Sequence, residues 1–354
     1  EEPLSLGLAD ALAAPGRVIF GPTAAAARLE GDKAWCKALV RNASVPMAEG
    51  RAFSDYSAAK NYVETREDPP VIKASGLAKG KGVVVPSTME EALAALERIM
   101  VKLEFGEAGR TVVIEEKLEG SEVSVLNLVD GRNIYMLEPC QDHKRLGEGD
   151  TGPNTGGMGA ICPGGITDDA LLNQIQAEII VPTVDALRRE GVEFQGVLYA
   201  GVMLTPAGPK LLEFNTRFGD PECQVLMVRL DSDLIDLMLA TGRRKLDEAD
   251  VRWSTDAVCC VVLASRGYPN RYKTGIPIEG LDAAAAVPGV VVFHAGTRRE
   301  AGSEGKIVTS GGRVLNVVAK APTMAEARKR AYEACDLIKF EGKTLRRDIG
   351  AAAK

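Results

Sequence analysis

The sequence predicts a globular protein of mixed α/β and α+β class with two or three domains. The chain has 354 residues, which is enough for more than one hydrophobic core. Segments with helical periodicity alternate with short β-branched strands up to about residue 245. Beyond that point three strands and one helix form a separate group, which predicts a small α+β domain at the C-terminal end.

The first elements are expected between residues 16 and 86. Residues 16–20 predict a short strand. Residues 23–42 predict a helix that breaks at Gly31 and restarts with Asp32 as its N-cap. Residues 69–86 predict two short strands around a loop of glycines and lysines.

The next elements surround a long loop. Ser87 and Glu90 have the spacing of a capping box, and an amphipathic helix should follow them. Residues 111–139 predict three strands, with Asp130-Gly131 as a hairpin turn. Residues 140–165 hold eight glycines without periodicity, so a long loop is expected that is either functional or disordered.

The rest of the chain predicts helices and strands in both halves. A helix should run from Thr167 to about Glu190, and Asp231 or Ser232 should cap another helix. Thr323 and Glu326 should cap a last helix that reaches about Ile338. The predicted strands are residues 196–205, 209–215, 257–265, 290–296 and 312–320.

Composition and charge exclude several classes of protein. Hydrophobic residues make up 45% and charged residues 26% of the chain, as in ordinary soluble proteins. No apolar run approaches the roughly 20 residues that span a bilayer, and the acidic start lacks the basic region of a secretory signal. The net charge of −6 argues against a general nucleic-acid binder. We therefore expect neither a membrane nor a nucleic acid as a partner.

The seven cysteines are scattered, and none forms a Cys-x-x-Cys pair. Because the only histidines are His143 and His294, neither a zinc site nor a disulfide framework is expected. An odd, scattered cysteine count suits the reducing cytoplasm, which is the compartment that we expect.

The stretch "KASGLAKGKG" (73–82) predicts a phosphate-binding loop between two strands. Its glycines let backbone amides approach a phosphate, and its lysines neutralise the charge. It is not a Walker A loop, because Gly82 follows Gly80-Lys81 where Ser or Thr is required. A solvated basic hairpin is the alternative.

The stretch "EEKLEGSE" (115–122) follows a β-branched strand. Its extended backbone could bind the edge of a purine, and an acid a few residues on could accept from the ribose hydroxyls. A solvated acidic turn is the alternative.

The stretch "LLEFNTRFGDPECQ" (211–224) ends a strand with an unusual set of polar groups. Glu213 and Asn215 are two residues apart, so they point the same way on a strand and suit Mg²⁺. Arg217 adds a planar fork for a carboxylate or a phosphate. A surface salt bridge at a strand end is the alternative.

The stretch "QDHKRLGEGDTGPNTGGMGA" (141–160) combines basic residues with glycines. Lys144 and Arg145 can hold a phosphate, and the glycines allow close approach of the backbone. His143 has no second histidine or cysteine nearby, so it receives no metal or catalytic role. A mobile surface linker is the alternative.

In this order, the four stretches resemble the ATP-grasp superfamily, in which two α+β lobes grip ATP. The resemblance is closer to one family, phosphoribosylamine–glycine ligase (glycinamide ribonucleotide synthetase). It rests on "FGPTAAAARLEGDKAWCK", "VIKASGLAKGKGV", "QDHKRLGEGDTGPNTGGMGA" and "EFNTRFGDPECQ", and it extends through "GYPNRYKTG", "VFHAGT" and "RRDIG".

The resemblance implies three domains. Residues 1–30 would be a remnant of an N-terminal Rossmann-like domain, and residues 31–245 the ATP-grasp domain, with a lid subdomain at about 45–120. Residues 246–354 would be the C-terminal α+β domain. The family's chains begin about 70 residues earlier, with a segment that helps to bind the phosphoribosyl substrate, so we expect that segment to be missing here.

The resemblance also implies a reaction. ATP phosphorylates the carboxylate of glycine, and the amine of 5-phosphoribosylamine attacks the glycyl phosphate, which gives glycinamide ribonucleotide, ADP and phosphate. The implied cofactors are ATP and Mg²⁺ or Mn²⁺, and a monomer is expected. The alternatives are another ATP-grasp ligase that joins a different acid and amine, or a nucleotide-binding fragment without activity.

Roles follow for residues that match the family's motifs. Lys73 and Arg217 would be catalytic, Lys73 on the ATP phosphates and Arg217 on the substrate carboxylate or acyl phosphate. Glu213 and Asn215 would bind the metal. ATP would be bound by Lys73, Ser75, Gly76, Lys79, Gly80, Lys81, Gly82, Glu115, Glu116, Leu118 and Glu122. The substrates would be bound by Asp142, Lys144, Arg145, Asp150, Thr151, Asn154, Thr155, Gly156, Gly157, Arg217 and Asp220.

Overall fold

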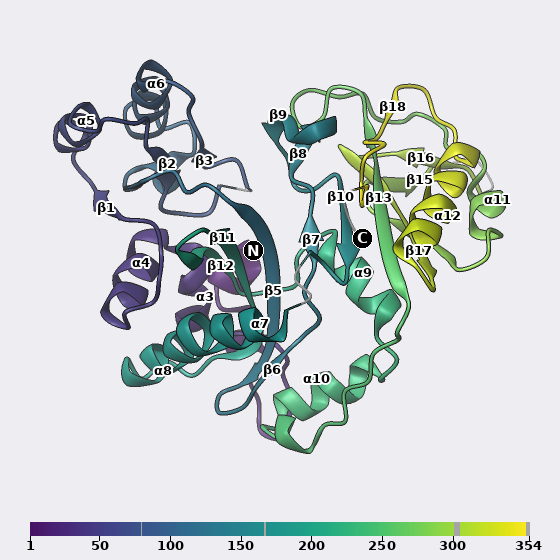
Figure 1. Cartoon of the computed structure of the whole chain (residues 1–354), viewed down its shortest axis with the longest axis horizontal. Coiled ribbons are helices and arrows are strands. Elements are labelled where there is room, and N and C mark those ends of the chain that lie inside the picture. The colour runs from purple at the N-terminus through teal and green to yellow at the C-terminus, as the bar shows by residue number, and fades with distance from the viewer. Residues whose placement is uncertain (79, 166–167, 301–304, 352–354) are drawn as a thin grey trace. The chain divides into compact units, whose positions relative to one another are not determined.

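A computed structural model describes the chain except for residues 79, 166–167, 301–304 and 352–354 (Figure 1). The described residues form two compact units, and each unit is built from separate segments of the chain. The first unit comprises Glu1–Leu137, Asp168–Phe218 and Ile235–Ala249. The second comprises Glu138–Thr167, Gly219–Leu234 and Asp250–Lys354, apart from the residues not described. The predicted boundaries at residues 30 and 245 therefore stay a prediction.

One antiparallel sheet of the first unit has the strand order β1-β4-β2-β3. Helices α5 and α6 pack on it through a core of aliphatic residues (Figure 1). The elements are β1 Gly50–Phe53, α5 Tyr56–Glu64, β2 Val71–Ala74, β3 Val83–Val84, α6 Met89–Met100, the 3₁₀ helix η1 Gly106–Gly109 and β4 Val112–Glu115. Strands β2 and β4 are buried along their whole length, so both faces of this part of the sheet are covered.

The other antiparallel sheet of this unit has the strand order β12-β11-β5-β6. Its strands are β5 Ser121–Asp130, β6 Ile134–Met136, β11 Gln195–Thr205 and β12 Gly208–Asn215. The helices of the unit are α1 Glu2–Ser5, α2 Leu8–Leu12, α3 Ala24–Gly31, α4 Lys33–Asn42, α7 Asp169–Ile175, the π-helical η3 Gln176–Ile180, α8 Val181–Arg189, α10 Leu234–Gly242 and η4 Leu246–Glu248. Helices α3 and α7 contact β12, the strand that carries Glu213 and Asn215.

The second unit is built on a six-stranded antiparallel sheet of order β14-β17-β13-β10-β7, with β18 also paired to β13. Helix α12 packs on the face that carries Cys259, Val261 and Leu263, and α9 contacts β10, β13 and β17. The elements are β7 Gln141–Asp142, β8 Arg145–Gly147, η2 Glu148–Asp150, β9 Thr151–Asn154, β10 Gly159–Cys162, α9 Glu222–Arg229, β13 Ala257–Ser265, α11 Leu281–Ala285, β14 Val290–His294, β15 Thr297–Arg299, β16 Ile307–Thr309, β17 Arg313–Ala321, α12 Met324–Leu337 and β18 Lys343–Thr344.

Several local predictions are confirmed. The Asp32 carboxylate accepts a hydrogen bond from the Trp35 amide and caps α4, as an N-cap aspartate should. The Asp130 carboxylate accepts from the Arg132 and Asn133 amides and closes the β5–β6 turn. Thr323 caps α12 by accepting from the Glu326 amide.

Two local predictions are wrong. Residues 16–20 form no strand, because a short apolar run needs a partner strand and none of the described strands pairs with it. The cap of α6 lies one residue later than predicted: Thr88 accepts from the Glu91 amide, and the Glu91 carboxylate accepts from the Ser87 amide. In a capping box the acid would accept from the amide of the cap residue itself, and here it accepts from the residue before the cap.

The prediction of a long loop at 140–165 is also wrong. Strands β7 and β10 of this stretch belong to the central sheet of the second unit, and β8 and β9 form a hairpin between them. The hairpin has no hydrophobic alternation because all four residues of β9 are exposed. Periodicity therefore could not reveal it.

Candidate active site

A buried cluster of two lysines and one glutamate links β2, β4 and α4 in the first unit. Glu115 Oε2 lies 2.6 Å from Lys73 Nζ, and Glu115 Oε1 lies 2.7 Å from Lys37 Nζ. Lys37 also donates to the Ala48 carbonyl at 2.7 Å. All three side chains are at most one tenth exposed, and each carboxylate oxygen of Glu115 is paired with one buried lysine.

Burial opposes the charge of each member of this cluster. It raises the pKa of Glu115, but the two lysines outweigh it and hold that pKa below its ordinary value. It lowers the pKa of Lys73, but Glu115 outweighs it, Glu213 adds to the effect, and the pKa is raised. For Lys37 burial prevails and lowers the pKa. Glu115 is therefore ionised and Lys73 is a firmly held cation at neutral pH.

Lys73 also bonds to the second sheet of the unit, and a β-bulge makes this possible. The register of β12 against β11 pairs Leu211 with Val202 and Glu213 with Gly201, which leaves Leu212 without a partner in the ladder. Lys73 Nζ donates to the Leu212 carbonyl at 3.0 Å. The extra residue of a bulge is left out of the ladder, so its carbonyl is available to another donor.

The bulge also decides which side chains of β12 are buried. Pro209 and Leu211 are buried before the bulge, and Phe214 is buried after it. The buried positions thus change from odd to even numbers at Leu212. As a result Glu213 and Asn215 lie on the less buried face of the strand rather than in line with Leu211.

Glu122 and Glu213 converge over Gly201 on the same sheet. A Cβ atom placed on Gly201 would lie 3.5 Å from Glu213 Cγ and 3.9 Å from Glu122 Oε1. Glu213 and Asn215 present oxygen donors on one face, and such donors suit Mg²⁺ or Mn²⁺ together with ligand phosphates. Within the part of the chain that the structure describes, no group of three His, Cys, Asp or Glu side chains could hold a metal, so amide and ligand oxygens would have to complete this site.

The predicted phosphate loop joins β2 to β3, and Lys79 lies outside the described residues. Ser75 is buried, and its hydroxyl donates to Asp32 and accepts from the Ala34 amide, which ties the start of the loop to α4. Gly80 has a φ of 72° with open space around it, while Lys81 is exposed. Gly76 and Gly82 pack closely, because a Cβ would lie 2.7 Å from Ala108 or 2.6 Å from Ala78 Cβ.

The predicted hinge residues line a groove of about 1060 Å³ in the first unit. Glu115, Glu116 and Leu118 all contribute to its wall. The Glu116 carboxylate accepts from the Glu49 amide and from Lys210, so it braces the groove. Lys73, Glu122 and Glu213 do not line it, and the groove therefore does not join the hinge to the phosphate and metal candidates.

Arg217 follows β12 and is held by acids of the same unit. Its guanidinium lies 2.9 Å from Glu30 and 2.7 Å from Glu1, and it donates to the Phe218 carbonyl. Buried Glu30 also accepts from the backbone amide and the hydroxyl of Thr216. The Arg217 side chain remains about one third exposed.

The other substrate candidates lie in the second unit. Asp142 is on β7, Arg145 is on β8, and Thr151 and Asn154 are on β9. Between the hairpin and β10, the Thr155 hydroxyl donates to the Lys144 carbonyl and accepts from the Gly157 amide. The structure thus brings Asp142, Lys144, Arg145, Asp150, Thr151, Asn154, Thr155, Gly156, Gly157 and Asp220 into one unit and Arg217 into the other.

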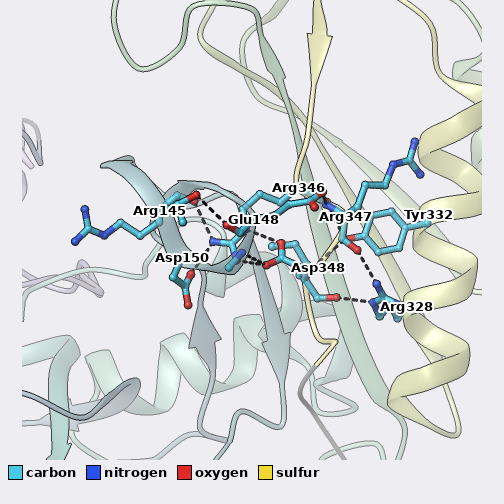
Figure 2. A network of polar contacts seen from close by, with 11 residues as sticks. Arg145, Glu148, Asp150, Arg328, Tyr332, Arg346, Arg347 and Asp348 are labelled. Carbon is cyan, nitrogen blue, oxygen red and sulfur yellow. Dashed lines mark hydrogen bonds and ion pairs between the residues drawn. The ribbon is translucent and has the colours of Figure 1, made fainter.

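A buried arginine from the C-terminal segment braces this hairpin (Figure 2). Arg346 is 2% exposed and donates to Asp150 at 2.7 Å, to the Arg145 carbonyl at 3.0 Å and to both carboxylate oxygens of Asp348. Asp348 in turn accepts from the Gly149 amide, and Glu148 accepts from the Arg347 amide. Asp150, predicted to bind substrate, therefore also pairs with the brace.

Sequence reasoning missed Lys37, the bulge and Arg346. A parity conflict could have revealed the bulge, because apolar Leu211 and polar Glu213 and Asn215 cannot share one face of a regular half-buried strand. Lys37 gave no such signal, since Glu115 lies 78 residues away, and neighbouring Asp348 could not show that Arg346 also binds Asp150, 196 residues away.

Two further observations concern predictions made from composition. All seven cysteines are free thiols in the structure. Among the described residues, no helix has the length and apolar character needed to cross a membrane.

Comparisons with known families and proteins agree with this architecture. Residues 31–223 match the ATP-grasp (A) domain of phosphoribosylglycinamide synthetase, and residues 258–352 match the C domain of the same family. The phosphoribosylamine–glycine ligase of Rhodopirellula baltica is 48% identical over 360 residues, which cover all of this chain and 82% of that protein. The chloroplastic ligase of Arabidopsis thaliana is 50% identical over 353 residues, which cover 99% of this chain and 66% of that protein.

Solved structures give the same result. The phosphoribosylamine–glycine ligase of Thermotoga maritima aligns with a TM-score of 0.82 at 35% identity, covering 93% of this chain and 81% of that one. A biotin carboxylase domain from Hydrogenobacter thermophilus, solved with MgADP, aligns with a TM-score of 0.68 at 18% identity, covering 92% of this chain and 69% of that one. This second likeness supports the fold alone, which is the ATP-grasp fold. The chain belongs to the phosphoribosylglycinamide synthetase family of ATP-grasp ligases.

Proposed function

We propose that the chain joins glycine to 5-phosphoribosylamine through a glycyl phosphate, with the roles of individual residues given below. The 48% sequence identity with the phosphoribosylamine–glycine ligase of Rhodopirellula baltica, over the whole chain, supports this reaction. The hydrogen bond from Lys73 to the Leu212 carbonyl is the observation that supports the proposed roles, because it joins the lysine of one sheet to the strand that carries Glu213 and Asn215. The comparisons give no support to another ligase or to a fragment without activity.

The chemistry needs an activated acid and a dry site. A carboxylate is a poor electrophile, so a glycine oxygen first attacks the γ-phosphorus of ATP and ADP leaves. The amine of 5-phosphoribosylamine then attacks the glycyl carbonyl carbon, phosphate leaves and the amine loses a proton. Exclusion of water would protect the acyl phosphate between the two steps. No covalent protein nucleophile is required.

Lys73 is the cation that we place on the ATP phosphates. Because Glu115 raises its pKa, it stays protonated while it stabilises charge that moves onto the leaving ADP. Lys81 and the backbone of the glycines would cover the phosphates from the loop. The groove wall at Glu116 and Leu118 would offer backbone groups to the purine, and Glu122 would accept from the ribose hydroxyls.

Glu213 and Asn215 would hold a divalent ion, for which Mg²⁺ and Mn²⁺ both suit oxygen ligands. When bound, such an ion neutralises phosphate charge. Arg217 would hold the carboxylate of glycine by its fork, and the candidates of the second unit would hold the amine substrate by hydrogen bonds and by the charges of Lys144 and Arg145. A monomer in a reducing cytoplasm completes the proposal, and light scattering after size exclusion would test the oligomeric state.

The test is release of ADP by the chain with Mg²⁺ and ATP. Three mixtures are compared: no substrate, glycine alone, and glycine with 5-phosphoribosylamine made in place from ribose 5-phosphate and ammonia. Release that requires both substrates supports the reaction. Replacing one of them with a panel of other acids and amines then tests its specificity, and equal rates with unrelated pairs would contradict the proposal.

A second test addresses the metal site. Glu213→Ala should lower Mg-ATP-dependent turnover by at least about 100-fold while the fold survives, since the strand keeps its backbone pairing. Glu97→Ala is the matched control, because Glu97 lies on α6 and its ion pair with Lys102, just beyond that helix, is exposed to solvent. Full activity of Glu213→Ala would refute the metal assignment.

A further inference from the structure

One arginine of the C-terminal segment contacts two separate stretches that carry substrate candidates. Arg313 Nη1 donates to the Gly156 carbonyl at 2.5 Å and to the Asp220 carbonyl at 2.6 Å. Its Nη2 lies 3.3 Å from the Asp220 carboxylate. All of these residues belong to the second unit, and the Arg313 side chain is 20% exposed. The guanidinium therefore joins the end of the glycine-rich stretch to the turn before α9.

Tyr268 holds the same glycine from the other direction. The Gly156 amide donates to the Tyr268 hydroxyl at 2.9 Å, so both polar groups of this peptide residue are bound by side chains of the C-terminal segment. The ring of Tyr268 lies against Gly312, where a Cβ would come within 2.4 Å of Cδ2. The Tyr268 ring thus packs against the residue before Arg313, and both side chains bind the turn at Gly156.

Close packing leaves this turn little freedom to move. Gly157 has a φ of 111°, and a Cβ there would lie 2.5 Å from Pro221 Cδ and 2.7 Å from Asp142 Oδ1. The Asp220 carboxylate also accepts from Gln224 at 3.0 Å and from buried Asn316 at 3.4 Å. Small shifts of the turn would therefore change the position of Asp142 and Asp220 together.

The arginine is suited to this task by its shape. A planar fork can bind two carbonyls and a carboxylate in fixed directions, whereas the single ammonium of a lysine cannot reach all three. All of these acceptors belong to the protein, so the contacts of Arg313 do not depend on a ligand. The guanidinium is occupied by protein groups, and its role is to position rather than to react.

We propose that Arg313 and Tyr268 are positioning residues that hold the Gly156–Gly157 turn against Asp220, so that these groups meet the amine-bearing substrates in a fixed geometry. The inference rests on the proposed function for its effect on turnover. The contacts themselves are independent of it.

Hydrogen–deuterium exchange tests the contacts without turnover. Arg313→Ala and Tyr268→Phe should raise exchange at the Gly156 amide about tenfold, because each removes an anchor of that peptide. Arg330→Ala is the matched control. Arg330 lies on α12 and, like Arg313, donates to a backbone carbonyl, but its acceptor is Lys320, away from the turn. Unchanged exchange in both test variants would overturn the inference.

Kinetics test the role in positioning. Arg313→Ala should raise KM for glycine or for 5-phosphoribosylamine at least about tenfold and leave KM for ATP within about twofold. Arg313→Lys should recover little, while added guanidinium ion should partly restore Arg313→Ala. Loss of stability alone would lower the active fraction and leave each KM unchanged, and that result would overturn the positioning role. If the unmutated chain releases no ADP with both substrates, the proposed function fails, and the exchange measurement still decides the inference.

Discussion

Each unit has a cluster of ion pairs around a buried charged side chain, Glu115 in the first unit and Arg346 in the second. The two clusters have opposite ratios of cations to carboxylates. In the first unit two cations, Lys37 and Lys73, share one carboxylate at contact distance. In the second unit one cation, Arg346, is shared by the carboxylates of Asp150 and Asp348. The lysine cluster therefore has one surplus positive charge and the arginine cluster one surplus negative charge, although protein groups bind the cations in both. Only the surplus positive charge of the first cluster suits the phosphate-binding role that we propose for Lys73.

The largest effect on stability is expected for Glu115→Gln. The change leaves two buried lysines without their shared counter-ion, which should lower the free energy of unfolding by about 3–5 kcal/mol. Urea unfolding measures it, with Glu97→Gln on the surface as the control. A loss below about 1 kcal/mol would show that the lysines do not depend on Glu115.

The next effect is on turnover and distinguishes the two lysines. Lys73→Met should lower turnover about 100- to 1000-fold, because a cation aimed at developing charge is removed. Stability should change less than in Glu115→Gln, since Glu115 keeps Lys37. Steady-state kinetics and urea unfolding measure both quantities, with exposed Lys60→Met as the control. Normal turnover in Lys73→Met would remove it from the phosphate site.

A smaller effect is expected when the brace is broken. Arg346→Met should lower the free energy of unfolding by about 2–3 kcal/mol, the scale for loss of hydrogen bonds to charged groups. Asp150→Asn should cost less than about 1 kcal/mol, since the Asp150 side chain is largely exposed. If Asp150→Asn were the more harmful to stability, Arg346 would not be the centre of the brace.

The smallest effect concerns pH. Arg346 holds the pKa of Asp348 at about 2, below its ordinary value of 3.8, although burial works in the opposite direction. A lowered pKa in the folded state stabilises the fold above pH 3.8 and loses this contribution as the pH falls toward 2. Thermal unfolding between pH 5 and pH 2 should therefore show wild type converging on Asp348→Asn. A constant difference between them would contradict the assignment.

Local signals predicted much of the fold, because their causes lie within a few residues. Asp32 and Thr323 cap their helices three residues from the amide that they bind, and Asp130 closes its turn over the same distance. The strand predicted at residues 16–20 is not formed, because a strand also needs a partner strand and a short apolar run does not specify one. The hairpin at 145–154 failed because its strands bury no alternating face.

The candidate site was predicted in its residue types and not in its contacts. The spacing of Glu213 and Asn215 placed both on one face, which the strand bears out. It could not show that Glu115 would be occupied by two lysines or that Ser75 would be bonded to the cap of α4. Such contacts depend on how distant segments pack, and the assigned roles in binding and catalysis stay predictions.

The unpaired residue of β12 has a consequence for how the strand tolerates sequence change. Because Lys73 binds a main-chain oxygen at Leu212, the side chain at that position contributes nothing to the bond. Substitutions at 212 should therefore be permissive. Deletion of that one residue would instead make β12 a regular strand, in which Glu213 and Asn215 keep their face but the extra carbonyl that Lys73 binds is lost. The type of residue at position 212 can therefore vary, but the strand needs one residue there.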